Sequence, residues 1–352
     1  MKALVFREFG GTEKLKYEEV PDPTPQENEI IVRVKASSIN HLDLWMRQGI
    51  RGPEIPMPHI SGCDGSGEVV QLGKNVSGLA LNEKVLIYPG ISCGECRYCK
   101  TGWDSLCPAY HIVGYQIQGT FAEYVKIPAG CAIPIPEKLS FEEAASIPLV
   151  FLTAYHMLFT RAKIKIGEDV LVMAAGSGVG SSAIQLAKAA GTRVIASAGS
   201  QEKLELAKKL GADETINYQK DDLTQKIKNL TGGRGVDVII EHVGGENFKK
   251  GLYALSRNGR IVTCGATAQP IIDLDLRLLF VRHVNLIGSY MGAKWELLEV
   301  IKLFQAGKLK AVVDKAFPLS QGGRAQQYVE ARKNMGKILL IPQATSHLKP
   351  ES

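Results

Sequence analysis

The chain has 352 residues, of which 45% are hydrophobic and 22% are charged. This ordinary globular composition excludes disordered, collagen-like and coiled-coil proteins, and the length suits about two domains. The net charge of +6 is spread along the chain without a basic block or arm. The charge therefore argues against a nucleic-acid partner and is compatible with an anionic small molecule.

The beginning of the chain does not resemble a targeting segment. Residues 1–9 carry Lys2 and Arg7 and lack the continuous apolar stretch of a secretory signal. No uncharged apolar run reaches the roughly 18 residues of a membrane-spanning helix. We therefore expect a soluble, cytoplasmic protein with no membrane partner.

The first part of the sequence has the pattern of a β domain. Short runs rich in Val and Ile, at residues 29–36, 68–72 and 84–88, are separated by Pro and Gly and predict short strands joined by turns. We expect residues 1–150 to form a barrel-like domain with long loops.

Four of the seven cysteines lie within one loop of this region. Two, two and seven residues separate them in the order Cys93, Cys96, Cys99 and Cys107. In a reducing compartment such a cluster favours metal binding over disulfides. Four thiolates close a tetrahedral zinc shell and leave no position for water, so we predict one structural zinc ion.

From about residue 165 the pattern changes to alternating strands and helices, which is typical of a parallel sheet covered by helices. The predicted strands are 169–174, 193–197, 214–217, 236–241, 260–264 and 285–288, and the predicted helices are 181–190, 201–210, 222–230 and 247–255. We predict a doubly wound dinucleotide-binding domain over residues 151–289. A helix at 294–305 and strands at 312–317 and 337–341 lie in a segment, 290–342, that we expect to complete the first domain, and 343–352 is expected to be a flexible tail.

The turn at residues 174–180, AAGSGVG, follows an apolar strand and opens a helix, where a glycine-rich loop indicates a dinucleotide pyrophosphate site. We favour the register Ala175-x-Ser177-x-x-Gly180, in which Val179 and Gly180 pack helix against strand and Gly178 lies within the turn. The other register, Gly176-x-Gly178, would put Ser181 where the last glycine belongs. A bare tight turn is the structural alternative.

The end of the second strand bears on the choice between NADP(H) and NAD(H). An NAD site usually places a carboxylate about 20 residues beyond the glycine turn. This strand ends in Ser-Ala-Gly-Ser, and Ser200, Lys203 and Tyr218 could hold a 2′-phosphate. We therefore favour NADP(H), with NAD(H) possible, although Lys203 could equally be a solvated lysine.

These features together resemble the medium-chain dehydrogenase/reductase superfamily over residues 1–342. The resemblance implies a GroES-like β-barrel catalytic domain with a four-cysteine zinc lobe, followed by a Rossmann domain. In the zinc alcohol dehydrogenases of this superfamily a Cys, a His and a second Cys hold a catalytic zinc. The corresponding residues here are Asn40, Cys63 and Leu149, which cannot form that shell.

The pattern at Asn40 and Asp43 is instead similar to the quinone and enoyl reductases, which work without a metal. The resemblance then implies hydride transfer from NADPH to a conjugated carbonyl, a quinone or an enone, with Asn40 beside the nicotinamide. His41 would lie near the pyrophosphate or supply a proton, Asp43 would bond backbone groups, and Cys63 and Asp64 would border the cleft. The remaining residues expected to touch the cofactor are Thr153, Gly244, Cys264, Gly265 and Ser289.

Two alternatives to this hypothesis stay open. His41, His59, Asp64 or His156 could build an unusual zinc shell for an alcohol dehydrogenase, and the chain could be a non-enzymatic nucleotide-binding protein. No side chain is an evident proton donor, so water or a cofactor hydroxyl could serve. Relatives of this kind form homodimers or homotetramers, which we also expect here.

Overall fold

The computed structural model describes residues 1–49 and 55–343. The chain forms two compact units, one of Met1–Cys93, Ala109–Pro148 and the segment from Val313 onward, the other of Gly94–Pro108 and Leu149–Val312. The predicted flexible tail lies, beyond residue 343, outside the described residues. Within the described ranges no helix has the length and apolar character needed to span a bilayer.

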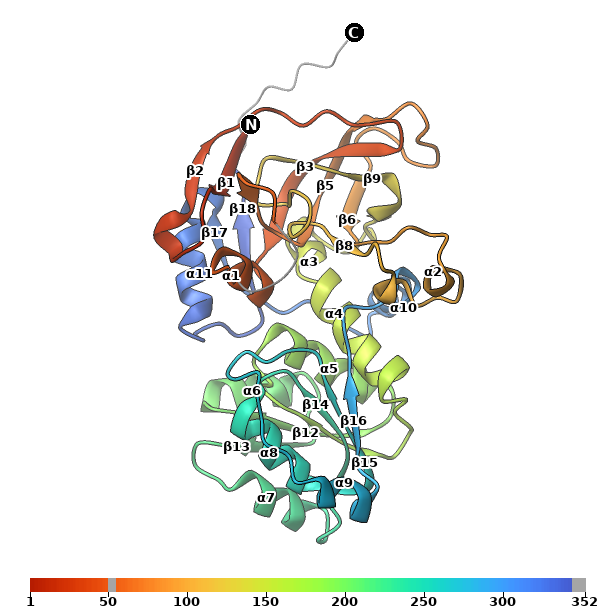
Figure 1. Cartoon of the computed structure of the whole chain (residues 1–352), viewed down its shortest axis with the longest axis vertical. Coiled ribbons are helices and arrows are strands. Elements are labelled where there is room, and N and C mark those ends of the chain that lie inside the picture. Colours follow the sequence, from red (N-terminus) through yellow and green to blue (C-terminus); the bar gives the residue numbers. More distant parts are fainter. Residues whose placement is uncertain (50–54, 344–352) are drawn as a thin grey trace. The chain divides into compact units, whose positions relative to one another are not determined.

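The first unit is built on antiparallel strands around β3 (Figure 1). Its larger sheet has the order β10-β6-β5-β3-β18-β17, with β9 also paired to β3, and a smaller sheet has the order β2-β1-β4. The bounds are β1 Lys2–Phe6, β2 Lys16–Glu19, β3 Glu29–Ser38, β4 His59–Ile60, β5 Asp64–Leu72, β6 Lys84–Ile87, β9 Tyr124–Pro128, β10 Ala132–Pro134, β17 Val313–Pro318 and β18 Lys337–Ile341. This architecture confirms the predicted barrel-like β domain.

The end of the chain returns to the first unit. Strand β18 pairs antiparallel with β3 through Leu339↔Ser38 and Leu340↔Ser37. Helix α11 (Gly322–Glu330) contributes Ala325 and Val329 to the same core as Leu4 and Ile338. This pairing brings the start of β18 beside the segment that follows β3.

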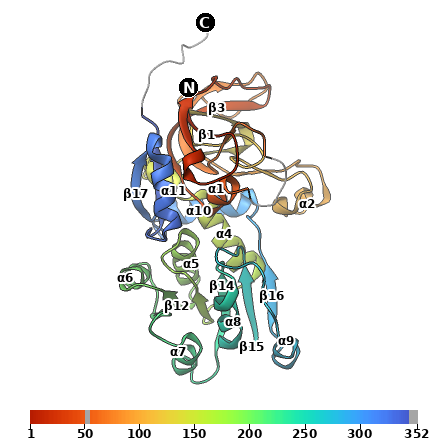
Figure 2. The same cartoon turned by 60° about the vertical axis from the view of Figure 1, so that its left-hand side comes forward.

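The second unit is a six-stranded parallel sheet of order β13-β12-β11-β14-β15-β16, and Figure 2 shows helices on both of its sides. The chain runs outward from β11 in one direction and from β14 in the other, which is the doubly wound order with its crevice at the carboxyl ends of these two strands. The strands are β11 Asp169–Val172, β12 Arg193–Ala198, β13 Glu214–Asn217, β14 Val236–Glu241, β15 Leu255–Thr263 and β16 Asn285–Gly288. This confirms the predicted fold class.

Apolar faces of the crossover helices hold this sheet. Leu223 and Ile227 of α7 and Phe248 and Leu252 of α8 share one core with Ile239 of β14. The helices of the unit are α2 Arg97–Lys100, α5 Gly178–Ala189, α6 Gln201–Lys209, α7 Leu223–Leu230, α8 Gly245–Ala254, α9 Leu276–Arg282 and α10 Lys294–Gln305, and α4 Pro148–Tyr155 begins at the unit's edge and continues as the π-helical turn His156–Arg161. The first unit adds α1 His41–Arg47 and α3 Phe141–Ala145.

The contacts divide the chain differently from the predicted domain boundaries in two places. Residues 290–312 pack with the second unit, because Phe304 of α10 meets Phe151 edge-on at 4.9 Å between ring centroids and Lys310 bonds Gln185. The cysteine loop packs there too, since Trp103 lies against the ring of His156. Only the segment from Val313 onward completes the first unit.

Candidate active site

The segment after β3 is held by a carboxylate from its own first helical turn. Asn40 precedes α1, and Asp43 Oδ2 accepts from the Asn40 backbone N–H at 2.7 Å. The other oxygen of Asp43 accepts from the Gly62 N–H at 3.0 Å. Burial raises the pKa of Asp43 to about 7, although these hydrogen bonds and the nearby Lys337 oppose the rise. Asp43 thus fixes the backbone beside Asn40 and Cys63.

A buried charge cluster surrounds the Asn40 side chain. Its Nδ2 donates to Asp64 Oδ2 at 2.8 Å, and its Oδ1 accepts from Lys337 Nζ. The ammonium of Lys337 also lies 3.0 Å from Asp64 Oδ2. Both charged side chains are buried, with Lys337 4% and Asp64 0% exposed. The Ser38 hydroxyl lies 3.2 Å from the carboxylate and shares its one hydrogen with the Ala145 carbonyl oxygen at 2.8 Å.

The other residues predicted near this place differ in their chemistry. Cys63 is fully buried, and burial together with Asp43 and Asp64 raises the pKa of its thiol well above the ordinary value. His41 is half-buried, and burial together with Arg332 and Lys337 lowers the pKa of its imidazole. Both residues therefore carry uncharged side chains near neutral pH.

The histidines considered for an unusual zinc shell have other partners. His59 Nε2 lies 3.0 Å from the Gly114 carbonyl oxygen, and His156 Nδ1 lies 2.9 Å from Glu296 Oε2. Asp64 is engaged by Lys337. Across residues 1–49 and 55–343, the one grouping of His, Cys, Asp or Glu atoms with metal-binding spacing is the cysteine cluster.

That cluster has the geometry of a closed metal site. The sulfur atoms of Cys93, Cys96, Cys99 and Cys107 all lie within 4.8 Å of one another. The short pair β7 (Gly90–Ile91) and β8 (His111–Ile112) closes the base of the loop. Four soft thiolate ligands at this spacing suit a tetrahedral zinc ion.

The glycine-rich turn of the second unit fits a dinucleotide pyrophosphate. Ser177 caps α5, its hydroxyl accepting from the Gly180 N–H at 2.9 Å, and the helix begins at Gly178. A Cβ on Gly180 would lie 2.4 Å from the Ala174 carbonyl oxygen. Only glycine permits this close approach of helix to strand, and Ala175 and Ser177 precede Gly180 in the same turn. Val179 lies in the first helical turn.

The end of β12 gathers the three side chains predicted to hold a 2′-phosphate. Ser200 caps α6, and the Lys203 side chain lies over the glycine turn, since a Cβ on Gly176 would be 2.7 Å from its Cγ and Cδ. The Tyr218 hydroxyl lies beside Gly199, 2.8 Å from where a Cβ would stand. An acid, the exposed Glu202, is also near, and hydrogen bonds from its own backbone N–H and from the Ser200 hydroxyl lower the pKa of its carboxyl.

Other predicted cofactor residues lie at the carboxyl ends of the later strands. Gly244 has a φ of 77°, and its N–H donates to Glu241 Oε1 at 2.7 Å. Cys264 follows β15, and burial raises the pKa of its thiol to about 12. The Gly265 carbonyl oxygen accepts from the Thr263 hydroxyl. Thr153 of α4 is 5% exposed. The hydroxyl oxygen of Ser289 is buried and has no hydrogen-bond partner among the described residues.

Three residues of these sites were not identified from the sequence. Lys337 begins a correctly predicted strand, but its pairing with Asp64 across 273 positions has no local signal. Glu241 accepts from Val243 and Gly244 at the end of β14. His242 lies 3.0 Å from the Ser177 hydroxyl; its position directly after a predicted strand was the available signal.

Comparison with known proteins agrees with this architecture. The profile of the alcohol dehydrogenase GroES-like domain matches residues 26–137, and that of the zinc-binding dehydrogenase matches residues 178–306. The crystal structure of an NAD-dependent alcohol dehydrogenase is 44% identical, covers 97% of this chain and 99% of its own, and has a TM-score of 0.94.

Two curated relatives have different names. An alcohol dehydrogenase of Geobacillus stearothermophilus is 35% identical over 320 residues, which are 89% of this chain and 92% of the relative. An acryloyl-coenzyme A reductase of Sulfurisphaera tokodaii is 31% identical over 345 residues, which are 97% of this chain and 100% of the relative.

The matches first define the class, a GroES-like domain joined to a dinucleotide-binding domain. The chain belongs to the medium-chain dehydrogenase/reductase superfamily, in its zinc alcohol dehydrogenase-like group. It is accordingly an NAD(P)-dependent oxidoreductase acting on small molecules.

Proposed function

We propose that this oxidoreductase uses NADPH to reduce a conjugated carbonyl, a quinone or an enone, without a catalytic metal. The observation that carries the proposal is the Asn40 cluster. Where the zinc enzymes have a metal-binding Cys, this chain has an amide bonded to both Lys337 and Asp64. A buried ammonium 3.0 Å from the carboxylate satisfies its charge and repels a second cation.

The residues of the second unit fit the cofactor. The N–H groups after Ser177 would hold the pyrophosphate at the start of α5, and Lys203 and Tyr218 would hold a 2′-phosphate. The orphaned Ser289 hydroxyl and the buried Thr153 would meet the nicotinamide half. When bound, the nicotinamide supplies the hydride.

The acceptor is inferred from the side chains at Asn40, Cys63 and Leu149, whose chemistry does not suit a catalytic zinc shell. A simple ketone needs strong polarisation before it accepts hydride, which a zinc ion supplies in the alcohol dehydrogenases. A quinone or enone delocalises the arriving charge onto its own oxygen. Hydrogen bonding from Asn40 and a proton from water then suffice, and the protein's contribution is positioning.

We also propose that the four cysteines hold a structural zinc ion. Their thiolates would fill the whole coordination shell, and the loop between them packs on the second unit through Trp103. Trp295 of α10 donates to the Gly102 carbonyl at 3.3 Å. The metal would stabilise this loop and take no part in the reaction.

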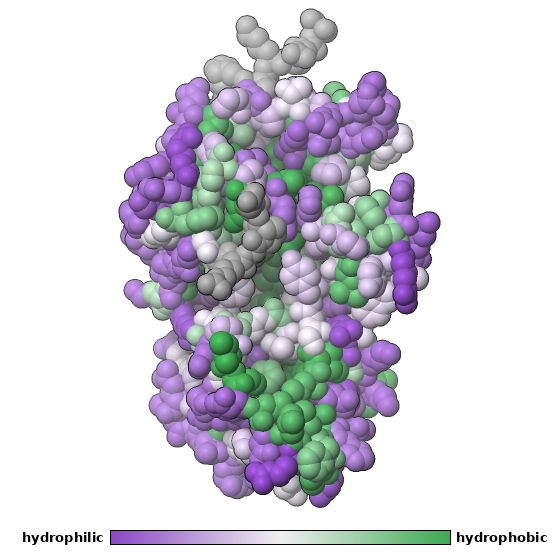
Figure 3. Space-filling model, in the orientation of Figure 1, coloured by the Kyte–Doolittle hydropathy of each residue, from purple (hydrophilic) through white to green (hydrophobic). Residues whose placement is uncertain are grey.

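We further propose that the protein forms a homodimer or homotetramer through the edge of the second sheet. Strand β16 lies at that edge, and Figure 3 shows hydrophobic side chains gathered on this unit. The exposed apolar residues of α9 and β16, here called the edge patch, are Leu276, Phe280, Val281 and Leu286. An unpaired strand beside such a patch is a ready surface for a second copy.

A second candidate is a zinc-dependent alcohol dehydrogenase, which the 44% identity to an NAD-dependent alcohol dehydrogenase favours. The two candidates differ in substrate and in metal requirement. A zinc enzyme would oxidise secondary alcohols and lose turnover when its catalytic metal is removed.

The deciding experiment measures NADPH oxidation with 2-cyclohexenone and 1,4-benzoquinone, and NAD(P)⁺ reduction with 2-butanol, on the purified protein. We expect turnover with at least one conjugated acceptor, and alcohol oxidation at least about 100-fold slower, the cost of lacking one strong transition-state contact. Faster alcohol oxidation, or no NADPH oxidation with either acceptor, would contradict the proposal.

A further inference from the structure

We propose that Lys337 and Asp64 are positioning residues that hold the Asn40 carboxamide in one orientation, with one N–H directed to the substrate carbonyl oxygen. This inference rests on the proposed function and adds to it the device that replaces a metal. Hydrogen-bond chemistry alone assigns the oxygen and the NH₂ group of the Asn40 amide.

The partners of the amide are of opposite kinds. A lysine ammonium has three donors and no acceptor, so the atom of Asn40 that it contacts must be the carbonyl oxygen. An ionised aspartate only accepts, so the atom that it contacts must be the NH₂ group. A flipped amide would place NH₂ against ammonium and oxygen against carboxylate, and both contacts would be repulsive.

The two partners are themselves fixed. Lys337 is 4% exposed, Asp64 is 0% exposed, and the two pair directly at 3.0 Å. Lys337 begins β18, which is joined to β3 at Leu339↔Ser38, and Asp64 begins β5, where it faces Ser38. The backbone of Asn40 is held by the Asp43 carboxylate. Neighbouring strands of one sheet thus determine the orientation of the side chain.

This arrangement leaves one donor for a ligand. The NH₂ group carries two hydrogens, and within the described residues one of them is used, in the bond to Asp64. The ammonium on the carbonyl oxygen draws electron density from the amide and makes the remaining N–H a stronger donor. The amide therefore carries a fixed, partly positive hydrogen where a metal-based enzyme has its Lewis acid.

The free N–H of Asn40 matters most in the transition state, when negative charge develops on the substrate oxygen. The hydride forms a bond to the β-carbon of the enone, the C=C π pair shifts, and negative charge develops on the carbonyl oxygen as an enolate. Water then protonates the α-carbon. A donor aimed at the developing charge lowers the barrier, and loss of one such donor costs about 10²–10³-fold in kcat.

The test is a double-mutant cycle on enone reduction with Asn40→Ala, Lys337→Met and the double variant. If Lys337 acts through Asn40, each single substitution lowers kcat by about 10²-fold and the double variant is no worse than either. Lys337→Arg, which retains the charge and donors, should recover part of kcat. The NADPH dissociation constant should stay within about threefold of the wild-type value in all variants.

Lys333→Met is the matched control, because this exposed lysine lies in the same segment outside the cluster, and its kcat should be unchanged. Multiplicative losses in the double variant, or a large rise in the NADPH dissociation constant on Lys337→Met, would overturn the inference in favour of a separate role.

A readout without turnover separates this inference from the proposed function. In protein labelled with ¹⁵N-asparagine, the Asn40 NH₂ signal is identified by its loss in Asn40→Ala. We expect both proton signals to be displaced from the shifts of a solvent-exposed asparagine and to exchange slowly with water, and we expect these shifts to move and the exchange to become faster in Lys337→Met but not in Lys333→Met. If the wild type reduces no conjugated carbonyl, the proposed function fails and these signals alone decide whether Lys337 orients the amide; unchanged signals in Lys337→Met would contradict it.

Discussion

The buried cluster of Asn40, Asp64 and Lys337 carries a large desolvation free energy, because two of its side chains are charged. A buried ion pair contributes to stability only when its geometry is good and its remaining hydrogen bonds are made, and removing one partner costs about 3–5 kcal/mol. Here Lys337 bonds Asp64 and Asn40, and Ser38 bonds the same carboxylate. These hydrogen bonds hold Lys337, Asp64 and the Asn40 amide in place and leave one amide N–H for a ligand, which suits a positioning role.

The residues around the end of β12 lead to a prediction about cofactor choice. Lys203→Ala removes a cation from beside the glycine turn, so the KM for NADPH should rise about tenfold, equivalent to about 1.4 kcal/mol, while the KM for NADH changes little. Glu202→Gln removes a nearby carboxylate and should lower the KM for NADPH. Steady-state kinetics measure both.

The control for that prediction is Lys209→Ala, an exposed lysine at the end of the same helix. It should leave both KM values unchanged. A wild-type preference for NADH, or equal effects of Lys203→Ala on the two cofactors, would contradict the assignment of a 2′-phosphate site.

Asp43 leads to a prediction about pH. Burial raises its folded-state pKa from 3.8 to about 7, so between pH 4 and pH 7 the folded protein retains a proton that the unfolded chain has released. The free energy of unfolding should therefore fall as pH rises through this window, by up to about 1.4 kcal/mol per pH unit. Urea unfolding of Asp43→Asn should lack this part of the slope, and parallel pH profiles for the two proteins would refute it.

The sequence predicted individual site residues better than it predicted the contacts between them. The motif around Asn40, Ser200 at the end of the second strand and the four cysteines each have a local signal, because spacing along the chain reflects their role. Lys337 and Asp64 meet only through the β18–β3 and β3–β5 registers. No local pattern encodes a strand register across such a separation.

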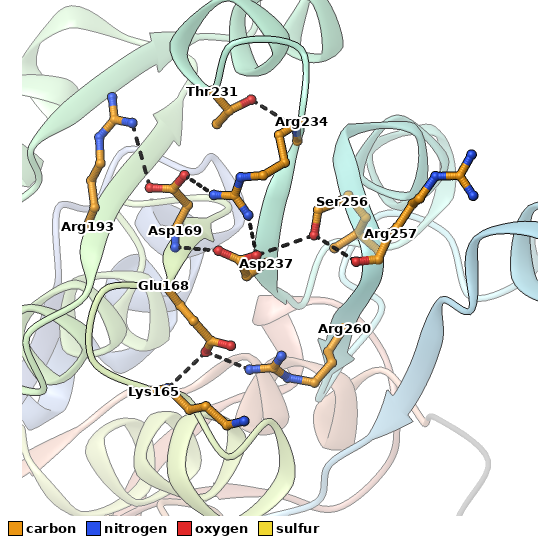
Figure 4. Close-up of polar contacts among 12 residues, drawn as sticks. Lys165, Glu168, Asp169, Arg193, Thr231, Arg234, Asp237, Ser256, Arg257 and Arg260 are labelled. Atoms are coloured by element: carbon orange, nitrogen blue, oxygen red, sulfur yellow. Dashed lines mark hydrogen bonds and ion pairs between the residues drawn. The ribbon is translucent and has the colours of Figure 1, made fainter.

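At the amino-terminal ends of the parallel strands, ion pairs connect neighbouring strands of the sheet (Figure 4). Arg234 Nη2 lies 2.6 Å from Asp169 Oδ2, and its other nitrogen contacts Asp237. Asp237 in turn accepts from the Asp169 backbone N–H at 2.8 Å. Arg260 pairs with Glu168 at 2.7 Å. The network connects β11, β14 and β15 at the end of the sheet away from the candidate cofactor site.

Breaking this network should reduce stability without affecting turnover. Arg234 is 49% exposed, so Arg234→Ala should lower the free energy of unfolding by only about 1 kcal/mol, and less at high salt. Arg257→Ala is the control, since this exposed arginine bonds a Val281 carbonyl outside the network. A lower kcat in Arg234→Ala under conditions where the variant is fully folded would contradict a purely structural role for this network.

The elements themselves were largely predictable. The strands at Glu214–Asn217, Val236–Glu241, Asn285–Gly288 and Lys337–Ile341 and the helix Lys294–Gln305 have the predicted bounds, because periodicity and flanking glycines mark them. Strand β15 starts five residues earlier than predicted, directly after α8, at a register shift against β14. An irregular pairing of this kind is set by the neighbouring strand and leaves no periodic signal.

For the whole molecule, the edge patch predicts the oligomeric state. Phe280, 66% exposed, lies on α9 beside the edge strand, so Phe280→Asp should convert a dimer or tetramer into smaller species in sedimentation analysis. Ile166→Asp changes an isolated residue that is 86% exposed and should leave the assembly intact. A wild-type monomer at micromolar concentration would contradict the proposed interface.

The central claim is that the protein carries one structural zinc ion and none at the reaction centre. The most direct measurement is the zinc content of the active protein by elemental analysis, together with enone-dependent NADPH oxidation in the same sample. The account predicts one zinc per chain in the wild type, held by the thiolates at Cys93, Cys96, Cys99 and Cys107, and none in Cys96→Ser. Two zinc ions per chain, with one persisting in Cys96→Ser and required for turnover, would contradict it.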